Sequence, residues 1–397
     1  MTGSNPPSSG AAPGSGAKVI HVTTVDMSLD LLLKPQLVAF AEAGYEVVGA
    51  SAPGPHVEEL EAVGVRHVPL VHATRSMDPV ADLRLAWELY RLFVRERPDV
   101  VHTHTPKPGW FGRPAARAAR VPAVVNTVHG LYATPDDGLA RRAVVYALER
   151  AASACSDAEL LQSSEDVPVL RRLRVPQRKL TVLGNGIDLA RFAPPTSAQR
   201  SASRAALGLA DHHVAVGVVG RLVWEKGLRE VIAMATELRR THPSARVLVA
   251  GGVEPDKADG LTALDLERVS AESGIEFVGE LRPIDSFYDA LDLYVLASYR
   301  EGFPRSAMEA AAKGLPLVLT DIRGCRQVVD PEVNGALVPP RDAGALTAAV
   351  SRLVDDADLR TRLGEGSTAK AATDFDQQNV IDITLDTYAR LLGNRAS

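Results

Sequence analysis

Cysteine is scarce in this chain, since Cys155 and Cys325 are the only two and lie far apart in the sequence. Because no CxxC spacing occurs, we expect neither a disulfide framework nor a cysteine zinc site, and a reducing cytoplasm is the simplest compartment. No apolar run approaches the roughly 20 residues of a membrane-spanning helix. Residues 1–17 are rich in Pro, Gly, Ser and Ala and lack the apolar core of a signal peptide, so we expect a disordered tail.

An excess of positive charge is also missing. The chain has 44 basic and 49 acidic residues and a formal net charge of −5, which argues against a general nucleic-acid binder. With 397 residues, 46% of them apolar, it is long enough for two globular domains.

Short apolar runs alternate with helical stretches from Lys18 onward, which is the pattern of a parallel α/β sheet. The runs 98–104 and 121–130 predict buried strands that end in polar residues, and ligands of such sheets bind at those carboxyl ends. The pattern restarts after a stretch rich in Pro, Ser and Ala. We therefore expect two Rossmann-like domains facing a cleft, over residues 18–195 and 213–375, with a linker at 196–212 and a final helical segment at 376–397.

The stretch from Tyr299 to Glu309 predicts a site for a sugar nucleotide. Pro304 stands where a helix tolerates proline, in its first turn, and the free N–H groups at that helix start favour a phosphate anion. Glu301 precedes the helix on a loop and Glu309 lies within it, so the two carboxylates could accept hydrogen bonds from hydroxyls at both ends of a ligand.

A second loop, Val219 to Gly227, follows a predicted strand and opens a helix. It carries Arg221 and Lys226, and two cations there could bind a diphosphate that gains charge as its bond breaks. The alternative is an ordinary solvated loop between a strand and a helix.

Three short motifs occur in the order and spacing found in one enzyme family. They are the segment 185–188 (Asn-Gly-Ile-Asp), Gly220-Arg221 with Lys226, and the Glu301/Glu309 pair. Together they resemble a retaining glycosyltransferase of family 4 over nearly the whole chain from Lys18. The resemblance implies the GT-B fold, with an N-terminal acceptor domain, a C-terminal nucleotide-sugar domain and a last helix that crosses back onto the first domain.

The resemblance also implies roles for individual residues. Arg221 and Lys226 would bind the donor diphosphate and Glu309 the ribose, while His129 would face the donor sugar near its anomeric carbon. The remaining donor contacts would come from Gly220, Glu301, the backbone of Gly302, Phe303 and Pro304, and the base-proximal segment that ends at Arg282. His104 and Lys107 would line the acceptor side.

Some of these residues have a structural alternative. A lone histidine after a strand, such as His129, is more often a hydrogen-bonding structural residue, although Gly130 beside it permits close backbone approach. His102 and His104 share one strand face and could ligate a metal, but no carboxylate or Cys cluster accompanies them. The Asp-x-Asp at Asp374 stands where a helix cap is expected. We therefore expect no metal and no cofactor besides the donor.

The expected reaction transfers a hexose-type sugar from a nucleoside diphosphate to a hydroxyl with retention of configuration. A sugar-nucleotide epimerase and a non-catalytic sugar-nucleotide-binding subunit remain alternatives. The acceptor could be a lipid carrier of cell-surface polysaccharide synthesis or a soluble natural product. Arginines beside apolar residues in 139–152 suggest peripheral contact with anionic lipid on the cytoplasmic face.

Overall fold

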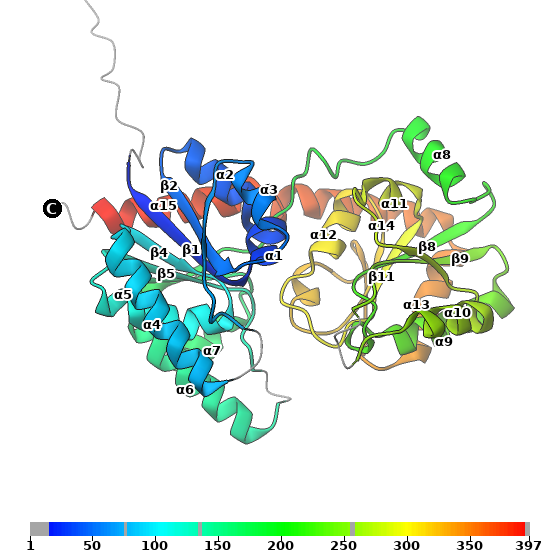
Figure 1. Ribbon diagram of the computed structural model, residues 1–397. Coiled ribbons are helices and arrows are strands. Elements are labelled where there is room, and N and C mark those ends of the chain that lie inside the picture. The colour runs from blue at the N-terminus through cyan, green and yellow to red at the C-terminus, as the bar shows by residue number, and fades with distance from the viewer. Residues whose placement is uncertain (1–15, 75–77, 134–136, 255–258, 394–397) are drawn as a thin grey trace, which may run out of the picture. The chain divides into compact units, whose positions relative to one another are not determined.

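The computed structural model describes residues 16–74, 78–133, 137–254 and 259–393. It divides the chain into two compact units (Figure 1). Unit 1 comprises Met1–Leu183 and Asn379–Ser397, and unit 2 comprises Gly184–Gln378.

Unit 1 is built on a seven-stranded parallel sheet with the strand order β3-β2-β1-β4-β5-β6-β7. The strands are β1 (Lys18–Val25), β2 (Glu46–Ala52), β3 (Arg66–Pro69), β4 (Val100–Thr103), β5 (Ala123–Val128), β6 (Ala158–Leu161) and β7 (Leu180–Val182). The helices are α1 (Asp26–Ser28), α2 (Lys34–Glu42), α3 (Val57–Glu61), α4 (Pro79–Glu96), α5 (Arg113–Ala118), α6 (Leu139–Ala154), α7 (Asp166–Arg172) and α15 (Gln377–Gly393).

Helices cover both faces of the sheet in unit 1, so apolar side chains of the strands are buried on both faces. Leu85, Leu89 and Phe93 of α4 pack on one face, together with α5. On the other face, Val380, Ile381 and Tyr388 of α15 pack with α2 and the strands. The prediction that the last helix returns to the first domain is confirmed.

Unit 2 is built on a six-stranded parallel sheet with the strand order β10-β9-β8-β11-β12-β13. The strands are β8 (Val214–Val219), β9 (Ala245–Ala250), β10 (Glu276–Gly279), β11 (Leu293–Leu296), β12 (Leu317–Thr320) and β13 (Gly335–Val338). The helices are α8 (Ser197–Ala206), α9 (Leu228–Thr241), α10 (Ala263–Ser273), α11 (Asp285–Ala290), α12 (Arg305–Ala312), α13 (Ala343–Asp355) and α14 (Ala357–Asp374). Both sheets have the doubly wound order, so the predicted pair of Rossmann-like domains is confirmed.

The boundary between the units differs from the expected one. The chain leaves unit 1 after Leu183, and the segment 196–212 is part of unit 2 because it forms α8. Thr196 and Gln199 form a capping box at the start of α8. Arg200 and Arg204 on this helix both bind the carboxylate of Asp292, at 2.7 and 3.0 Å. A Ser/Ala-rich composition suggested a linker, whereas the cap and the arginines make a docked helix.

The two ends of unit 2 lie side by side. Ile187 donates its N–H to the carbonyl of Phe375 at 2.9 Å, and Gln377 donates its N–H to the carbonyl of Ile187 at 3.1 Å. Ile187 also forms a parallel bridge with Asp376. The first and last segments of unit 2 are therefore hydrogen-bonded to each other.

None of the helices in the described part of the chain is both long and apolar enough to cross a membrane.

Candidate functional site

The loop after β8 in unit 2 is held by close backbone contacts. Gly220 donates its N–H to the carbonyl of Ala250 at 3.0 Å. Further along, Gly227 has a φ of +71° and caps α9, and a Cβ there would lie 2.0 Å from the carbonyl oxygen of Ala297. Only glycine fits such a position, so the turn that carries Lys226 packs directly against the end of β11.

That packing brings Lys226 to Glu301. The ammonium of Lys226 lies 2.6 Å from the Glu301 carboxylate, and both side chains are largely buried. The Glu301 loop is held from behind by Gly324, whose φ is +86° and whose Cβ position would lie 2.3 Å from the carbonyl oxygen of Gly302. Asn185 donates its side-chain N–H to the carbonyl of Phe303 at 3.4 Å.

The helix α12 begins directly after this loop. Pro304 occupies its N-cap, has no side-chain cap, and leaves the first N–H groups of α12 to a ligand or to water. Inside the helix start, the hydroxyl of Tyr294 donates to Ser306 Oγ at 2.7 Å. An ammonium, a carboxylate and a helix N-terminus thus meet at the carboxyl edge of the sheet.

Glu309 lies one turn further along α12 and is only 14% exposed at its side chain. The hydroxyl of Tyr288 donates to Glu309 Oε2 at 2.9 Å, and Arg305 Nε stands 3.9 Å from Oε1. Burial raises the pKa of Glu309, while Arg305 and Tyr288 oppose that shift. The carboxylate is therefore anchored on one oxygen by a tyrosine.

The structure places Arg221 and Arg282 at the same sheet edge, with acidic partners of their own. Arg221 pairs with Glu254 at 3.0 Å, and Arg282 pairs with Glu280 at 2.7 Å. About half of each arginine side chain is exposed. Neither shares an ion-pair partner with Lys226 among the described residues.

In unit 1, His129 follows β5 and His104 follows β4. They line a hollow of about 40 Å³ with Asn126 and Gly130, among others. Gly130 has a φ of +112°, which favours glycine at this turn. The structure therefore brings these two predicted histidines together at the carboxyl edge of the first sheet.

The two histidines belong to a buried cluster that also includes His21 and His102. His129 Nε2 lies 3.4 Å from His104 Nδ1, and His104 Nε2 lies 2.9 Å from His21 Nδ1. His102 bonds Tyr388 of α15 through Nδ1 at 2.5 Å and Thr127 through Nε2 at 2.7 Å. Burial lowers the pKa of His21 to about 3 and that of His129 to about 4, and it lowers the pKa values of the other two well below their usual range.

Three of these imidazoles, His21, His102 and His104, have nitrogens within 4.8 Å of one another. A metal ion would need one free lone pair from each ring, directed at a common point. Both nitrogens of His102 are already hydrogen-bonded, and His21 and His104 bond each other. The contacts in place are those of a hydrogen-bonded cluster.

Lys107 differs from its expected role on the acceptor side. Its ammonium is buried and bonds Asp82 of α4 at 2.5 Å and Thr74 at 3.2 Å. Lys107 also does not line the hollow of His104 and His129. The desolvated ion pair ties the loop after β4 to α4, which makes Lys107 a structural residue here.

Four residues of these sites were missed by sequence reasoning. Gly324 could have been suspected, since a glycine soon after a predicted strand marks close backbone approach. Tyr288, Tyr294 and His21 carry no local signal, because their partners come from distant segments. The expected cap is present at the last helix, where Asp376 accepts from the Gln378 N–H at 2.9 Å.

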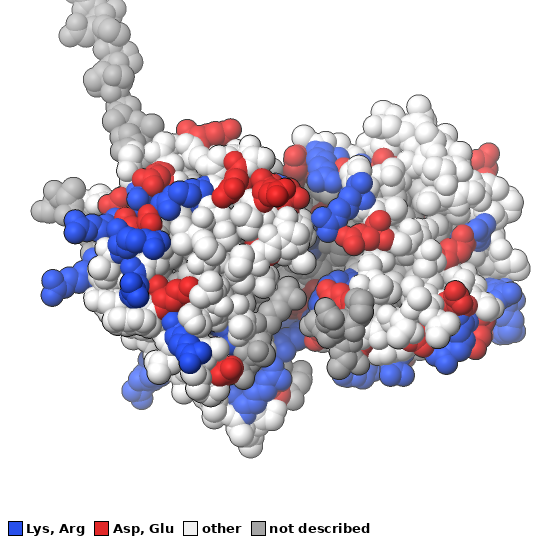
Figure 2. All heavy atoms as spheres, viewed as in Figure 1, with Lys and Arg blue, Asp and Glu red and all other residues white. Residues whose placement is uncertain are grey.

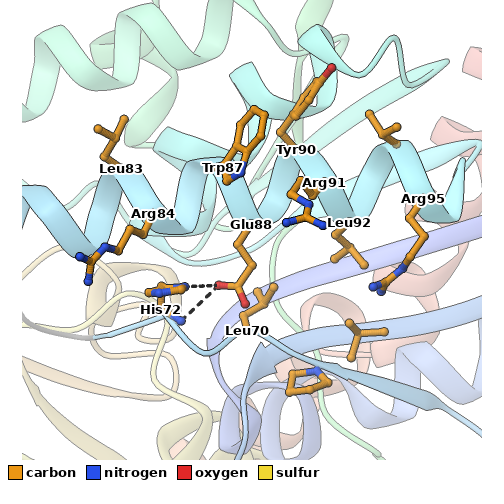
Figure 3. A pocket seen from close by; sticks show the side chains of 13 residues that line it. Leu70, His72, Leu83, Arg84, Trp87, Glu88, Tyr90, Arg91, Leu92 and Arg95 are labelled. Carbon is orange, nitrogen blue, oxygen red and sulfur yellow. Dashed lines mark hydrogen bonds and ion pairs between the residues drawn. The ribbon is translucent and has the colours of Figure 1, made fainter.

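A second and larger hollow, of about 810 Å³, lies on unit 1 along α4 and β3 (Figure 3). Leu83, Trp87 and Tyr90 project from one side of α4, and Trp87 and Tyr90 stack with ring centroids 5.4 Å apart. On the other side, Glu88 bonds His72 at 3.1 Å. The surface combines apolar groups with Arg84, Arg91 and Arg95.

Comparison with known proteins identifies the family. Residues 199–370 match the family described as glycosyl transferases group 1, and residues 37–191 match glycosyltransferase family 4. D-inositol 3-phosphate glycosyltransferase of Nocardia farcinica is 30% identical over 381 residues, covering 89% of this chain and 83% of that protein. The chain belongs to the group 1 and family 4 glycosyltransferases.

Two further similarities fit this family. The UDP-Gal:alpha-D-GlcNAc-diphosphoundecaprenol alpha-1,3-galactosyltransferase of Escherichia coli is 29% identical over 327 residues, covering 81% of this chain and 83% of that protein. The solved structure of HepE from Anabaena with UDP superposes with a TM-score of 0.79 at 19% identity, covering 94% and 100% of the two chains. The predicted GT-B fold and glycosyltransferase class are confirmed, and the epimerase and binding-subunit alternatives gain no support.

The buried histidines predict a pH dependence of stability. Because the folded-state pKa of His21 lies below its unfolded value, the unfolded chain binds more protons below about pH 6.5, and stability falls as the pH falls. Between pH 6.5 and 4.5, wild type should lose about 1.4 kcal/mol per pH unit more than His21→Asn. Urea unfolding at a series of pH values measures this, with exposed His212→Asn as the matched control. Equal slopes for wild type and His21→Asn would contradict it.

Proposed function

We propose that this glycosyltransferase moves a sugar from a nucleoside diphosphate donor to a hydroxyl acceptor, with retention of configuration and without a metal ion. The observation that carries the proposal is the pair of Lys226 and Glu301 at the N-terminal end of α12. An anion binds well where an ammonium meets a helix N-terminus, and a carboxylate beside it accepts hydrogen bonds from sugar hydroxyls.

In this reaction the bond between the anomeric carbon and the leaving diphosphate oxygen breaks. The acceptor oxygen attacks from the same face, and the leaving phosphate takes its proton, so no side-chain base is needed. Lys226 and Arg221 stabilise the charge that develops on the diphosphate. When the donor enters, Lys226 exchanges part of its contact with Glu301 for a phosphate oxygen, which frees Glu301 for the sugar.

Glu309 accepts a hydrogen bond from the ribose in this proposal. Its Oε2 accepts from Tyr288, and Oε1, 3.9 Å from Arg305 Nε, would accept from the ribose hydroxyl. The backbone of Gly302, Phe303 and Pro304 contacts the sugar and the distal phosphate. Gly220, which has no side chain, lets the diphosphate come close to the loop after β8. Arg282, on the exposed loop after β10, contacts the nucleoside end.

We further propose a lipid-linked acceptor of cell-surface polysaccharide or glycolipid synthesis, bound by unit 1 near His104 and His129. The Escherichia coli relative is named for an undecaprenol-diphosphate acceptor, which supports this class. A soluble natural product is the alternative. His129 contacts the donor sugar near its anomeric carbon.

A lipid-linked acceptor requires access to a membrane surface, on the cytoplasmic side where the donor is made. Along α4, exposed Leu83 and Trp87, at 74% and 61%, stand beside arginines on the adjacent helix face. Figure 2 shows basic side chains next to uncharged surface over this helix. Exposed Leu139 and Val144 add apolar surface on α6, where the sequence suggested lipid contact. Such a surface binds anionic lipid peripherally.

The reaction itself is tested by its product. Purified protein supplied with UDP-, GDP- and ADP-sugars and a lipid-linked diphosphate saccharide should form a product with the anomeric configuration of the donor. Proton NMR of the anomeric signal reads this out. Activity should be unchanged in excess EDTA. Inversion would overturn retention, and loss in EDTA with recovery on adding manganese or magnesium would overturn metal independence.

The roles of the two cations are tested by substitution. Arg221→Ala and Lys226→Met should each lower kcat by about 10²–10³, because a group that stabilises the developing charge is lost. The melting temperature should change little. Arg352→Ala, which breaks an exposed ion pair on the same unit, is the matched control and should keep wild-type turnover. Wild-type kcat in Lys226→Met would exclude the assignment.

Membrane contact is tested by vesicle co-sedimentation. Wild type should sediment with vesicles of phosphatidylcholine and phosphatidylglycerol and much less with phosphatidylcholine alone. Replacing both Leu83 and Trp87 by Gln should weaken binding at least about tenfold, since two large apolar side chains no longer leave water. Leu264→Gln removes an equally exposed leucine from unit 2 and should have no effect. Binding that is independent of anionic lipid would contradict this surface.

A further inference from the structure

The histidine cluster of unit 1 contains a continuous chain of three imidazoles that ends at His129. His129 Nε2 faces His104 Nδ1 at 3.4 Å, and His104 Nε2 faces His21 Nδ1 at 2.9 Å. His21 comes from β1, and the other two follow β4 and β5, so three different strand segments contribute to one chain. His21 and His104 are almost fully buried.

Each imidazole in the chain is neutral at physiological pH. Burial lowers the pKa of each of the three far enough that protonation is negligible near pH 7. Among the described residues no carboxylate is hydrogen-bonded to any of the three. The titratable neighbours His102 and Tyr388 pack against the chain, and burial keeps both uncharged. A neutral imidazole has one N–H donor and one bare nitrogen acceptor.

Neutral imidazoles that are hydrogen-bonded in series must all donate their N–H in the same direction along the series. If His21 donates from Nδ1, then His104 accepts at Nε2 and donates from Nδ1, and His129 accepts at Nε2. The reverse order places an N–H on His21 Nε2. One tautomer therefore determines the other two.

The buried end of the chain decides between the two orders. His21 Nε2 is fully buried and has no hydrogen-bond partner among the described residues. His21 also stacks on Phe40, with ring centroids 5.4 Å apart. A buried N–H without an acceptor is rarer in proteins than an acceptor without a donor, so Nε2 is the bare nitrogen. The proton of His21 then lies on Nδ1 and is donated to His104.

We propose that His21 and His104 are positioning residues that hold His129 in the Nδ1–H tautomer, with its Nε2 engaged as an acceptor. His129 then offers a single N–H, from Nδ1, to the outside of the chain. The side chain of Gln162 hydrogen-bonds the His129 ring and favours its protonated form, as an acceptor for an N–H does. A donor-sugar hydroxyl oxygen would compete with Gln162 for this N–H and would not meet a bare nitrogen.

His102 supports the chain without being part of it. Its ring lies 4.1 Å from that of His104, centroid to centroid, and its two nitrogens are fixed by Tyr388 and Thr127. Through Tyr388, helix α15 thereby fixes the His102 ring against which His104 packs. The orientation of His129 thus depends on residues from β1, β4, β5 and α15.

The tautomers are measured directly by long-range ¹H–¹⁵N correlation NMR on protein labelled at the histidine ring nitrogens. In wild type near pH 7, His21, His104 and His129 should all show protonated Nδ1 and bare Nε2. His129→Gln and His104→Gln assign the signals. A bare Nδ1 on His129 would overturn the proposal, and so would a positively charged ring in the chain.

A matched pair of variants tests the direction of the chain. His21→Phe keeps an aromatic ring on Phe40 but removes the donor, so His104 and His129 should become mixtures of both tautomers. His21→Asn places an amide N–H where Nδ1 stood and should restore the wild-type pattern. Wild-type tautomers in His21→Phe would overturn the role of His21, and if that variant fails to fold, the wild-type measurement still decides.

The kinetic consequence rests on the proposed function. His21→Phe should lower kcat about tenfold with a nearly unchanged KM for the donor, as expected for a weakened hydrogen bond at the sugar, and His21→Asn should recover it. A higher KM for the donor with an unchanged kcat would indicate a structural role and would contradict positioning. If no donor is turned over at all, the proposed function fails while the tautomer measurement still stands on its own.

Discussion

The Lys226–Glu301 pair of unit 2 depends on two backbone approaches that only glycine allows. Gly227 brings the turn after β8 against the end of β11, and Gly324 holds the loop after β11 from behind. Without these contacts Lys226 and Glu301 would sit on two independent loops, and their separation would vary with solvent. Since each approach is between main chains, side-chain substitutions elsewhere in unit 2 have little means of moving the pair. Rigid elements thus present the charged groups, which is what electrostatic stabilisation of a transition state requires.

The carboxyl edges of the two sheets carry different polar groups. In unit 2 the charged groups meet partners of opposite sign at the sheet edge, where solvent still reaches them, as with Arg221 and Arg282. In unit 1 the equivalent edge is occupied by imidazoles whose charge has been removed by burial. A neutral ring costs far less to bury than an ion and still has direction, because one nitrogen donates and the other accepts.

The features that could be predicted from the sequence are those determined by residues close together along the chain. The parallel sheets, the helix after Pro304 and the grouping of Lys226 with Glu301 follow from apolar periodicity and from short motifs. The interpretation of 196–212 as a linker was wrong in outcome because composition does not reveal that Asp292, far along the chain, binds two arginines of α8. Lys107 was misplaced for the same reason, since its partner Asp82 belongs to another helix. His21 was overlooked because a histidine within an apolar strand shows nothing of its neighbours.

The hydrogen bonds that join Ile187 to Phe375 and Gln377 have a consequence for how the chain folds. The core of unit 1 includes α15, which the sequence separates from the rest of that core by the whole of unit 2. Closing so long a loop is entropically unfavourable while unit 2 is a random coil. Once unit 2 has folded, its two ends are already neighbours, and the effective loop is only a few residues long. The topology therefore favours a folding order in which unit 2 folds first and α15 packs onto unit 1 last.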